Sequence, residues 1–310
     1  MTRAGFAAVI GAPNAGKSTL VNRLVGSKVT IVTQKAQTTR FPVRGVAMEG
    51  ESQIVLVDTP GIFRPRRRLD RAMVRAAWNG AQDADAVVHL VDAEAELAAE
   101  TDKAKAADRR SAEDVRTVIE GLRKAGRRAI LALNKIDRVR RDALLGLSQK
   151  IFETEAYSEI FMISATDGSG VDDLKRRLAE LMPEGPWLYP EDQAADLPQR
   201  LLAAEISREK LYLRVHEELP YAASVETTAF EEHRDGGVRI EQTIFVERES
   251  QRAIVIGKGG ATLKWIGQAA RQDLGEILGR PVHLFLTVKV KANWADERST
   301  YSDLGLDFDA

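Results

Sequence analysis

The sequence predicts an α/β domain with a mostly parallel sheet covered by helices on both faces, followed by an α+β domain. Three observations predict this organisation. Short apolar runs alternate with helical periodicity in the first 182 residues, four prolines follow close together, and the pattern then changes. A length of 310 residues also corresponds to about two domains at ~150 residues each.

The apolar runs of the first part have the length of strands and show no polar alternation. They are Ala7–Gly11, Ile54–Val57, Ala86–Val91, Ala129–Leu133 and Phe161–Ile163. Helical periodicity lies between them, at Lys17–Val25, Leu69–Gln82, Ala112–Ala125 and Val171–Leu181. Continuous apolar strands separated by helices are typical of a parallel sheet that is buried on both faces. The segment Glu94–Arg110 is rich in alanine and charge, and we expect a solvated helical insertion there.

Prolines 183, 186, 190 and 198 predict an extended inter-domain linker. After it, Gln199–Glu217 has a helical pattern, and Ala222–Glu232 and Val238–Arg248 are strands around the turn signal Asp235–Gly236–Gly237. A short helix, a glycine loop, a helix at 261–278 and a strand at 282–290 complete an αββααβ order. We therefore expect domains at 1–184 and 199–292, a linker at 185–198 and a tail at 293–310.

Composition excludes several classes of protein. The chain has no cysteine, which excludes disulfide frameworks, thiolate metal sites and cysteine nucleophiles. No segment resembles a leader or a membrane span, so we expect a soluble protein of the cytoplasm. The net charge of −1 conceals an asymmetry of +5 before Trp187 and −6 from there on. Within the acidic part, 247–291 holds eight basic and four acidic residues.

Residues 11–18, GAPNAGKS, match the phosphate-binding pattern G-x-x-x-x-G-K-[ST] between a strand and a helix. Glycines let backbone amides approach phosphates, and the helix N-terminus favours their negative charge. Lys17 would reach the β- and γ-phosphates, and the Ser18 hydroxyl would ligate Mg²⁺. The expected nucleotide-binding residues are Gly11, Ala12, Pro13, Asn14, Ala15, Gly16, Lys17, Ser18 and Thr19.

A second motif, Asp58-Thr59-Pro60-Gly61, follows the strand at 54–57. Asp58 could hold Mg²⁺ through water, and the backbone amide of Gly61 could reach a γ-phosphate. Between the two motifs, Gln37-Thr38-Thr39-Arg40 is a polar segment whose threonines could complete the Mg²⁺ shell. We favour Thr39, and Thr38 is the alternative.

Two further motifs follow later strands and indicate guanine recognition. In Asn134-Lys135-Ile136-Asp137, the carboxylate could accept hydrogen bonds from N1–H and the 2-amino group of guanine, a donor pair that adenine lacks. Asn134 would brace the loop and Lys135 would lie along the base. Ser164-Ala165-Thr166 could offer a backbone amide to guanine O6. All four motifs follow strands, at the edge where open α/β sheets bind ligands.

Together these motifs resemble the translation-factor-related GTPases, and KAQTTR at 35–40 with the second domain resembles the Era family of bacterial GTPases. The resemblance implies GTP hydrolysis, with Lys17, Thr39, Asp58 and Gly61 as catalytic residues and Ser18, Thr39 and Asp58 at Mg²⁺. Ile62 stands where Ras-like GTPases carry a water-orienting glutamine, so hydrolysis needs another group or a partner. The resemblance also implies that Asn14 helps to coordinate K⁺; the alternative is that Asn14 only shapes the loop.

In the second domain, Ile254–Gly260 resembles the I-G-x-x-G core of a type II KH domain, where a backbone of single-stranded RNA approaches closely. The expected RNA contacts are Ile256, Gly257, Lys258, Gly259, Gly260, Arg252, Lys264, Lys289 and Lys291, with Arg248 as a further candidate. Any of these charges could instead be a solvated surface group. We expect Trp265 in the core rather than as a base-stacking platform.

We therefore expect a GTPase switch that binds the 3′ end of 16S rRNA and assists maturation of the 30S subunit, as the family resemblance implies. We also expect a monomer, and the resemblance implies peripheral association with the inner membrane. The alternatives are an RNA-binding assembly protein with little or no GTPase activity, and a phosphotransferase. The run Arg64–Arg68 could contact phosphate or be a solvated face. The four histidines are scattered along the sequence, so we expect no histidine metal site.

Overall fold

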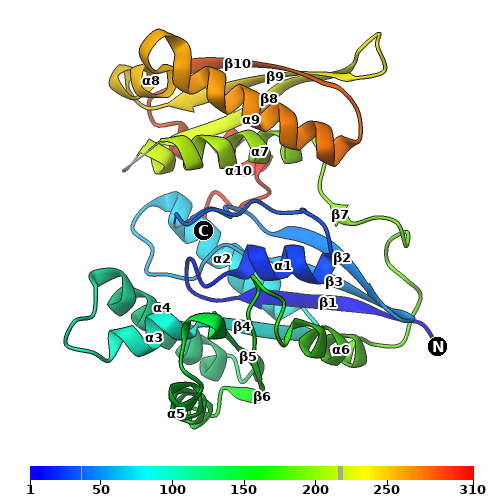
Figure 1. The fold of residues 1–310 in the computed structure, drawn as a ribbon, viewed down its shortest axis with the longest axis vertical. Coiled ribbons are helices and arrows are strands. Elements are labelled where there is room, and N and C mark those ends of the chain that lie inside the picture. The colour runs from blue at the N-terminus through cyan, green and yellow to red at the C-terminus, as the bar shows by residue number, and fades with distance from the viewer. Residues whose placement is uncertain (36, 216–218) are drawn as a thin grey trace. The chain divides into compact units, whose positions relative to one another are not determined.

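A seven-stranded sheet in the order β6-β5-β4-β1-β3-β2-β7 organises the first part of the computed structural model (Figure 1). The structure describes residues 1–35, 37–215 and 219–310. The strands are β1 Arg3–Ile10, β2 Val43–Glu49, β3 Ser52–Asp58, β4 Ala86–Asp92, β5 Ala129–Asn134, β6 Tyr157–Met162 and β7 Ala195–Asp196. β2 pairs antiparallel with β3 and β7, and the other neighbouring strands pair in parallel. The mostly parallel sheet is as predicted.

Helices cover both faces of this sheet. They are α1 Lys17–Val25, α2 Arg68–Asp83, α3 Ala93–Ala99, α4 Ala106–Lys124, α5 Arg141–Phe152 and α6 Val171–Leu181. One apolar core lies between the sheet and α2, α4 and α5, and a second between the sheet and α1 and α6. Because both faces are covered, strands such as β4 are buried along their whole length, which produces the continuous apolar runs in the sequence.

Several elements differ from the sequence prediction. β2, β7 and α5 were not predicted, and β6 begins at Tyr157 instead of Phe161 and ends before Ile163. The segment Glu94–Arg110 is helical and largely exposed, as expected, but it is divided between α3 and the start of α4 with a turn between them. Ala95 of α3 is buried. Of the missed elements, β7 is an edge strand of two residues, which is too short to produce an apolar period.

The proline-rich stretch before residue 198 is extended but fastened to the sheet. Gln53 accepts hydrogen bonds at Oε1 from the backbone amides of Leu188 and Tyr189, at 2.8 and 2.9 Å. Trp187 Nε1 donates to the backbone oxygen of Glu51 at 3.0 Å, and β7 then adds to β2. This stretch therefore folds as part of the first sheet.

The second part has the predicted αββααβ order. α7 spans Gln199–Arg214, and the predicted continuation to Glu217 falls partly on residues outside the described ranges. It is followed by β8 Ala223–Glu232, β9 Val238–Val246, α8 Glu249–Ile256, α9 Ala261–Leu278, β10 Val282–Val290 and an added α10 Arg298–Asp303. The sheet order is β10-β9-β8, with β9 antiparallel to β8 and parallel to β10. α7 and α9 pack on it around Ile206, Ile240, Ala270 and Leu284.

The chain forms two compact units, and each unit combines segments that are separated in the sequence. Unit 1 contains 1–30, 39–196 and 304–310, and unit 2 contains 31–38 and 197–303. The last residues thus fold with unit 1, where Arg75 pairs with Asp307 at 3.2 Å and Arg68 lies over the ring of Phe308. The expected domain limits, including a tail that starts at 293, stay predictions.

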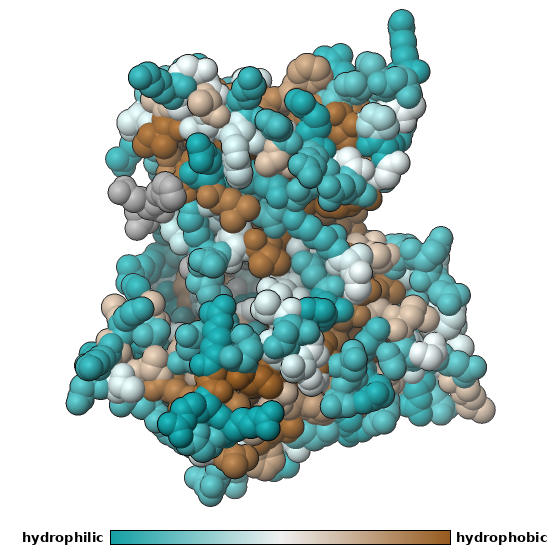
Figure 2. Space-filling view, in the orientation of Figure 1, coloured by the Kyte–Doolittle hydropathy of each residue, from teal (hydrophilic) through white to brown (hydrophobic). Residues whose placement is uncertain are grey.

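Both units have a largely hydrophilic surface on the face that Figure 2 shows, with apolar side chains in small groups. Within the part of the chain that the structure describes, no helix is both long enough and apolar enough to cross a bilayer.

Candidate functional site: a nucleotide site in unit 1 and a glycine loop in unit 2

The phosphate-binding loop is packed against the strands beside it. Gly11 has φ +152°, and a Cβ there would lie 2.4 Å from the backbone oxygen of Leu90. Gly16 has φ +102°, and a Cβ there would meet the side chain of Asn134 at 2.4 Å. Only glycine therefore fits either position, because both the backbone conformation and the space exclude a side chain. The loop leads directly into α1, so its amides lie at a helix N-terminus.

Lys17 is folded back over this loop and is buried. Its Nζ donates hydrogen bonds to the backbone oxygens of Gly11 and Ala12, at 3.2 and 2.8 Å. Burial lowers the pKa of Lys17 to about 8, although the negative charges of Asp58 and Asp114 oppose that shift. A nucleotide phosphate would supply the missing counter-charge for this ammonium group.

Three hydroxyl groups converge on one carboxylate oxygen, Oδ2 of Asp58. Ser18 Oγ donates to it at 2.7 Å, Thr30 Oγ1 at 2.8 Å and Thr39 Oγ1 at 3.3 Å. Ser18 Oγ also lies 3.0 Å from Thr39 Oγ1. The structure thus brings together Ser18, Thr39 and Asp58, the residues expected at Mg²⁺, and adds Thr30.

The Asp58 carboxylate has room for a cation. Its other oxygen, Oδ1, is buried and accepts no hydrogen bond from the described residues. Burial raises the pKa of Asp58, while hydrogen bonds from Ser18 and Thr30 act in the opposite direction. A set of hard oxygen donors around an incompletely satisfied buried carboxylate fits Mg²⁺, and Ser18, Thr39 and Asp58 would hold it.

The two threonines of the first switch segment have different surroundings. Thr39 is buried beside Ser18 and Asp58. Thr38 Oγ1 instead lies 2.6 Å from Thr33 Oγ1 and donates to the backbone oxygen of Lys35 at 2.7 Å. This arrangement favours Thr39 as the Mg²⁺ ligand.

Hydrogen bonds to β1 and the phosphate loop hold the second switch motif, 58–62, in place. Thr59 Oγ1 donates to the backbone oxygen of Val9 at 2.8 Å, and the amide of Ile62 donates to the backbone oxygen of Gly11 at 3.0 Å. A Cβ on Gly61 would meet the backbone of Pro13 at 3.0 Å. Ile62 is fully buried in the core, so its side chain cannot orient a water molecule. The arginines of 64–68 are exposed, which fits either interpretation of that run.

The predicted base-recognition loops are held together by Asn134. Its Nδ2 donates to the backbone oxygen of Ala15 at 2.8 Å, and its Oδ1 accepts from the amide of Ala165 at 2.9 Å. One buried side chain thereby links the phosphate loop to the loop at 164–166. The Asp137 side chain is 33% exposed, and Arg138 Nε lies 3.8 Å from its Oδ2. It is thus accessible to a base.

Asp92 and Arg23 support these loops, although no motif in the sequence indicates them. Lys135, which has φ +65°, pairs with Asp92 through its ammonium group. Asp92 also accepts a hydrogen bond from the amide of Ala95 as the N-cap of α3. Arg23 of α1 donates to the backbone oxygens of Ala165 and Thr166. Like Thr30, the residues Asp92 and Arg23 lie outside any short motif, so no local pattern could reveal them.

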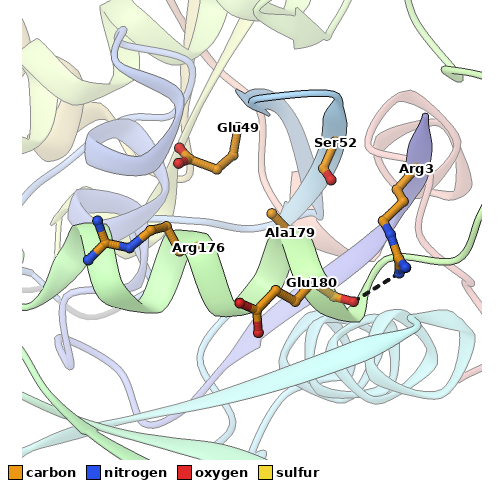
Figure 3. A pocket seen from close by; sticks show the side chains of 6 residues that line it. All are labelled: Arg3, Glu49, Ser52, Arg176, Ala179 and Glu180. Carbon is orange, nitrogen blue, oxygen red and sulfur yellow. Dashed lines mark hydrogen bonds between the residues drawn. The ribbon is translucent and has the colours of Figure 1, made fainter. Parts of the chain in front are cut away.

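The hollow in Figure 3 is a different feature. It is open to solvent and is lined by Arg3, Glu49, Ser52, Arg176, Ala179 and Glu180. Arg3 and Ser52 begin parallel strands β1 and β3, whereas the nucleotide loops follow the carboxyl ends of these strands. It therefore lies at the edge of the sheet opposite to the nucleotide loops.

The glycine loop of unit 2 joins α8 to α9. Gly257 has φ +73°, and a Cβ there would lie 2.3 Å from Thr262 Oγ1, so this glycine is required for packing. Gly259 and Gly260 have φ +60° and +77°, and a Cβ on either would meet nothing within 4 Å. Their backbone is thus open to a ligand, as close approach of a sugar-phosphate chain requires.

The candidate RNA contacts differ in their ion pairs. Arg252 Nη1 pairs with Glu249 at 2.7 Å, and Lys291 pairs with Glu297 at 2.6 Å. The remaining three lysines are exposed and form no ion pair with the described residues: Lys258, Lys264 and Lys289. The latter group is therefore better placed to bind phosphate.

The expectation that Trp265 lies in the core is wrong. Its side chain is 39% exposed and Arg214 lies over its ring at 5.4 Å. Position 265 falls on the outer side of α9, whereas its neighbour Ile266 is fully buried. An aromatic residue in a helical pattern does not by itself indicate which face of the helix it occupies.

Comparisons with known proteins agree with both units. Residues 6–135 match the family described as 50S ribosome-binding GTPase, and residues 218–295 match the KH domain family. Proteins called GTPase Era from Caulobacter vibrioides and Maricaulis maris are 73% and 62% identical to this chain. The alignments cover 99% of this chain and 98% of each relative.

Two solved structures extend over nearly the whole chain. Era from Aquifex aeolicus, in a point variant bound to GDP.AlF4⁻, is 36% identical with a TM-score of 0.85. Era in complex with MgGDPNP and nucleotides 1506–1542 of 16S ribosomal RNA is 37% identical with a TM-score of 0.87. Each alignment covers 98% of this chain and 99% of the other. The phosphate loop, the loops at 134–137 and 164–166 and the KH unit thus occur together in one chain, which belongs to the Era family of GTPases.

Proposed function

We propose that this chain is a GTP- and Mg²⁺-dependent switch that binds 16S rRNA near its 3′ end and assists maturation of the 30S subunit. One observation carries this proposal. Thr39 lies with Ser18 and Asp58 in unit 1, while the segment just before it, 31–38, folds with unit 2. A change at the γ-phosphate would therefore act on a chain segment that belongs to the RNA-binding part.

At the nucleotide, each group has a distinct task. The amides of 12–18 and Lys17 would bind the phosphates, and Gly61 would offer an amide to the γ-phosphate. Mg²⁺ supplies charge neutralisation of the phosphates, and Ser18, Thr39 and Asp58 would hold it. Asp137 would select guanine. Asn134 and Arg23 would hold the loop at 164–166 in place beside the base.

The first switch segment has several attachments within unit 2. Ile31 packs in the core with α7 and α9, and the amide of Val32 donates to Glu209 Oε1 at 2.9 Å. Lys35 donates to the backbone oxygens of Tyr212 and Val215, and Arg208 donates to the backbone oxygen of Thr38. When Thr39 binds or releases Mg²⁺, these attachments would bias the position of α7 and hence of unit 2.

Three features support RNA binding by unit 2. These are the open backbone at Gly259 and Gly260, the local basic charge of 247–291, and lysines 258, 264 and 289, which have no ion pair with the described residues. The relative in complex with 16S ribosomal RNA nucleotides supports the same ligand class. Because unit 2 is acidic elsewhere, the groove would depend on contacts to bases rather than on a general positive field.

The water-activating step needs a group other than Ile62. We propose that K⁺, held with the help of Asn14, offsets charge at the phosphates during hydrolysis. Asn14 is exposed at the mouth of the loop with φ +63°, a conformation that asparagine tolerates. Replacement of K⁺ by Na⁺ should then slow phosphate release, and Asn14→Ala should remove the difference between the two ions.

We also propose a monomer in the cytoplasm with peripheral association at the inner membrane. The acidic tail at 303–310 would be repelled by anionic lipid, so association would need a contact other than simple charge attraction. Cosedimentation with anionic and neutral vesicles tests this, and equal recovery in the supernatant with and without vesicles would contradict it.

The central experiment measures RNA affinity in two nucleotide states. The probe is a short single-stranded RNA that copies the 16S 3′ end, and the variants are Gly259→Asp and the matched control Gly279→Asp. Both glycines have φ near +60°, and a Cβ on either meets nothing within 4 Å, so neither change should disturb packing. Only the substitution at position 259 would place a negative charge beside the RNA backbone.

We expect wild type and Gly279→Asp to bind equally, with an affinity that differs between a GTP analogue and GDP. Gly259→Asp should bind at least about tenfold more weakly, because like charge at a close phosphate contact costs over 1 kcal/mol. Equal affinity of all three proteins in both nucleotide states would contradict the coupled switch. Absence of phosphate release with RNA and K⁺ present would favour the alternative, an RNA-binding assembly protein without GTPase activity.

A further inference from the structure

A cluster of two histidines and one aspartate lies at the end of the three-stranded sheet of unit 2. His233 follows β8, Asp235 lies in the turn that leads to β9, and His283 is the second residue of β10. Asp235 and His283 are 48 positions apart in the sequence. The β8–β9 turn lies beside the start of β10, because the amide of Val238 donates to the backbone oxygen of Pro281, and this brings the three residues together.

Backbone hydrogen bonds hold this turn in place. The amide of His233 donates to the backbone oxygen of Gly237 at 2.9 Å, and the amide of Val238 donates to the backbone oxygen of Pro281 at 2.9 Å. Asp235 Oδ1 also accepts from the amide of Gly237 at 2.9 Å. The donor atoms of the cluster are therefore positioned by a closed turn and a strand.

We propose that His233, Asp235 and His283 form a binding site for a divalent transition metal ion of the Zn²⁺ type. His233 Nδ1 lies 2.9 Å from Asp235 Oδ1, and His283 Nε2 lies 2.7 Å from Asp235 Oδ2. One donor atom from each residue lies within 4.8 Å of the others. Tetrahedral zinc with bonds of about 2.1 Å needs donors about 3.4 Å apart, so small side-chain movements suffice.

The chemistry of the donors selects this class of metal. Two imidazoles and a carboxylate suit Zn²⁺ and its neighbours, whereas Mg²⁺ and Ca²⁺ prefer oxygen ligands alone. The chain has no cysteine to compete for the ion. His233 and Asp235 are exposed and His283 is partly exposed, which leaves space for a water molecule as the fourth ligand.

The surrounding charges do not exclude a cation. Arg239, the register partner of His283, pairs with Glu241, and Arg280 pairs with Glu232 at 2.7 Å. The metal would join the β8–β9 turn to β10 and stabilise unit 2.

The test uses the full chain saturated with GDP and excess Mg²⁺, so that the nucleotide site is occupied before Zn²⁺ is added. Zn²⁺ is titrated into wild type, the double variant His233→Ala/His283→Ala and the control His216→Ala, whose position lies outside the described residues. Binding is followed by competition with a chromogenic chelator. Co²⁺ absorption in the visible range reports whether the bound ion is tetrahedral.

We expect one saturable site per chain with Kd on the order of micromolar in wild type and His216→Ala. In the double variant, affinity should fall at least about a hundredfold, because two of three ligands are lost. Zn²⁺ should raise the Tm of wild type and leave that of the double variant unchanged. Asp235→Asn and His283→Gln, which keep polar side chains, should each bind more weakly while GDP affinity stays at the wild-type level.

Equal Zn²⁺ affinity in wild type and the double variant would overturn the proposal, as would the absence of saturable binding at about 100 μM Zn²⁺. Neither result would bear on GTP or rRNA binding, since none of the three residues belongs to those sites. Loss of binding in His216→Ala would also overturn it, because the ion would then be held elsewhere.

Discussion

The two glycine loops of this chain use glycine for opposite reasons. In the phosphate loop, a Cβ on Gly11 or Gly16 would collide with protein atoms at 2.4 Å. In the loop of unit 2, a Cβ on Gly259 or Gly260 would extend into open space. Both loops need positive φ, but in the loop of unit 2 only Gly257 is closed in by protein atoms, at Thr262. Substitutions at Gly11 or Gly16 should therefore break a prebuilt site, while substitutions at Gly259 or Gly260 should report on a ligand.

The buried oxygen cluster of unit 1 should give the largest effect. Ser18→Ala removes a proposed Mg²⁺ ligand and one hydrogen bond to Asp58, and we expect GTP hydrolysis to fall by about 10²–10³-fold. Single-turnover phosphate release measures this. Thr39→Ala should have a comparable effect and Thr38→Ala a much smaller one. Equal loss in the two threonine variants would mean that the different surroundings of Thr38 and Thr39 do not determine the ligand.

The base-recognition loop should show the next largest effect. Asp137→Asn replaces an acceptor with an amide, so GTP affinity should fall by about 100-fold through loss of a charge-assisted pair. Xanthosine triphosphate, which has a carbonyl in place of the 2-amino group, should gain affinity. Competition against a fluorescent GDP analogue measures both. Unchanged selectivity would show that Asp137 does not read the base.

Lys17 predicts a pH dependence specific to the phosphate loop. Its pKa of about 8 in the free protein means that above this pH the ammonium is lost, and GDP binding must then take up a proton. Affinity in Mg²⁺-free buffer should be constant below about pH 8. Above it, affinity should fall by up to about tenfold per pH unit. Lys17→Met should bind weakly at every pH, and a wild-type profile that stays flat to about pH 9.5 would contradict the assignment.

Attachment of the first switch segment to α7 should contribute a smaller, state-dependent effect. Lys35→Met removes the hydrogen bonds to the backbone oxygens of Tyr212 and Val215. The ratio of RNA affinities in the GTP-analogue and GDP states should then move severalfold toward one. Lys103→Met, on the exposed turn after α3, is the matched control and should keep the wild-type ratio. An unchanged ratio in Lys35→Met would place the coupling elsewhere.

The open loop of unit 2 should show the smallest single-residue effect. Lys258→Ala should weaken RNA binding a few-fold. It should also reduce the slope of log K against log[salt] by about one, as the loss of one phosphate contact predicts. Lys291→Ala should change affinity less, because Glu297 already pairs with that lysine. Filter binding over a series of salt concentrations measures both. A larger loss for Lys291→Ala would show that its ion pair breaks on RNA binding.

Sequence alone was enough for the parts that depend on contiguous residues. The phosphate loop, the motifs at 58–61, 134–137 and 164–166, and α1 and α6 are local patterns, and the structure has both helices with the predicted limits. The αββααβ order was equally readable, because buried strands and amphipathic helices have distinct apolar periods. β7 was missed because a two-residue edge strand has no apolar period. In β2 the exposed Arg44 interrupts the apolar run, whereas α5 does bury Leu144, Leu147 and Ile151 at helical spacing.

Tertiary structure alone decided which distant residues meet. Thr30 joins Asp58, Arg23 holds the loop at 164–166, and the β8–β9 turn brings His233 to His283. It also assigned 31–38 to unit 2, although these residues lie in the middle of the first domain's sequence. Periodicity and motifs describe neighbours along the chain, whereas hydrogen bonds and packing depend on distances in space. The sequence thus determined which motif residues form each site, and the tertiary structure decided which distant residues they contact.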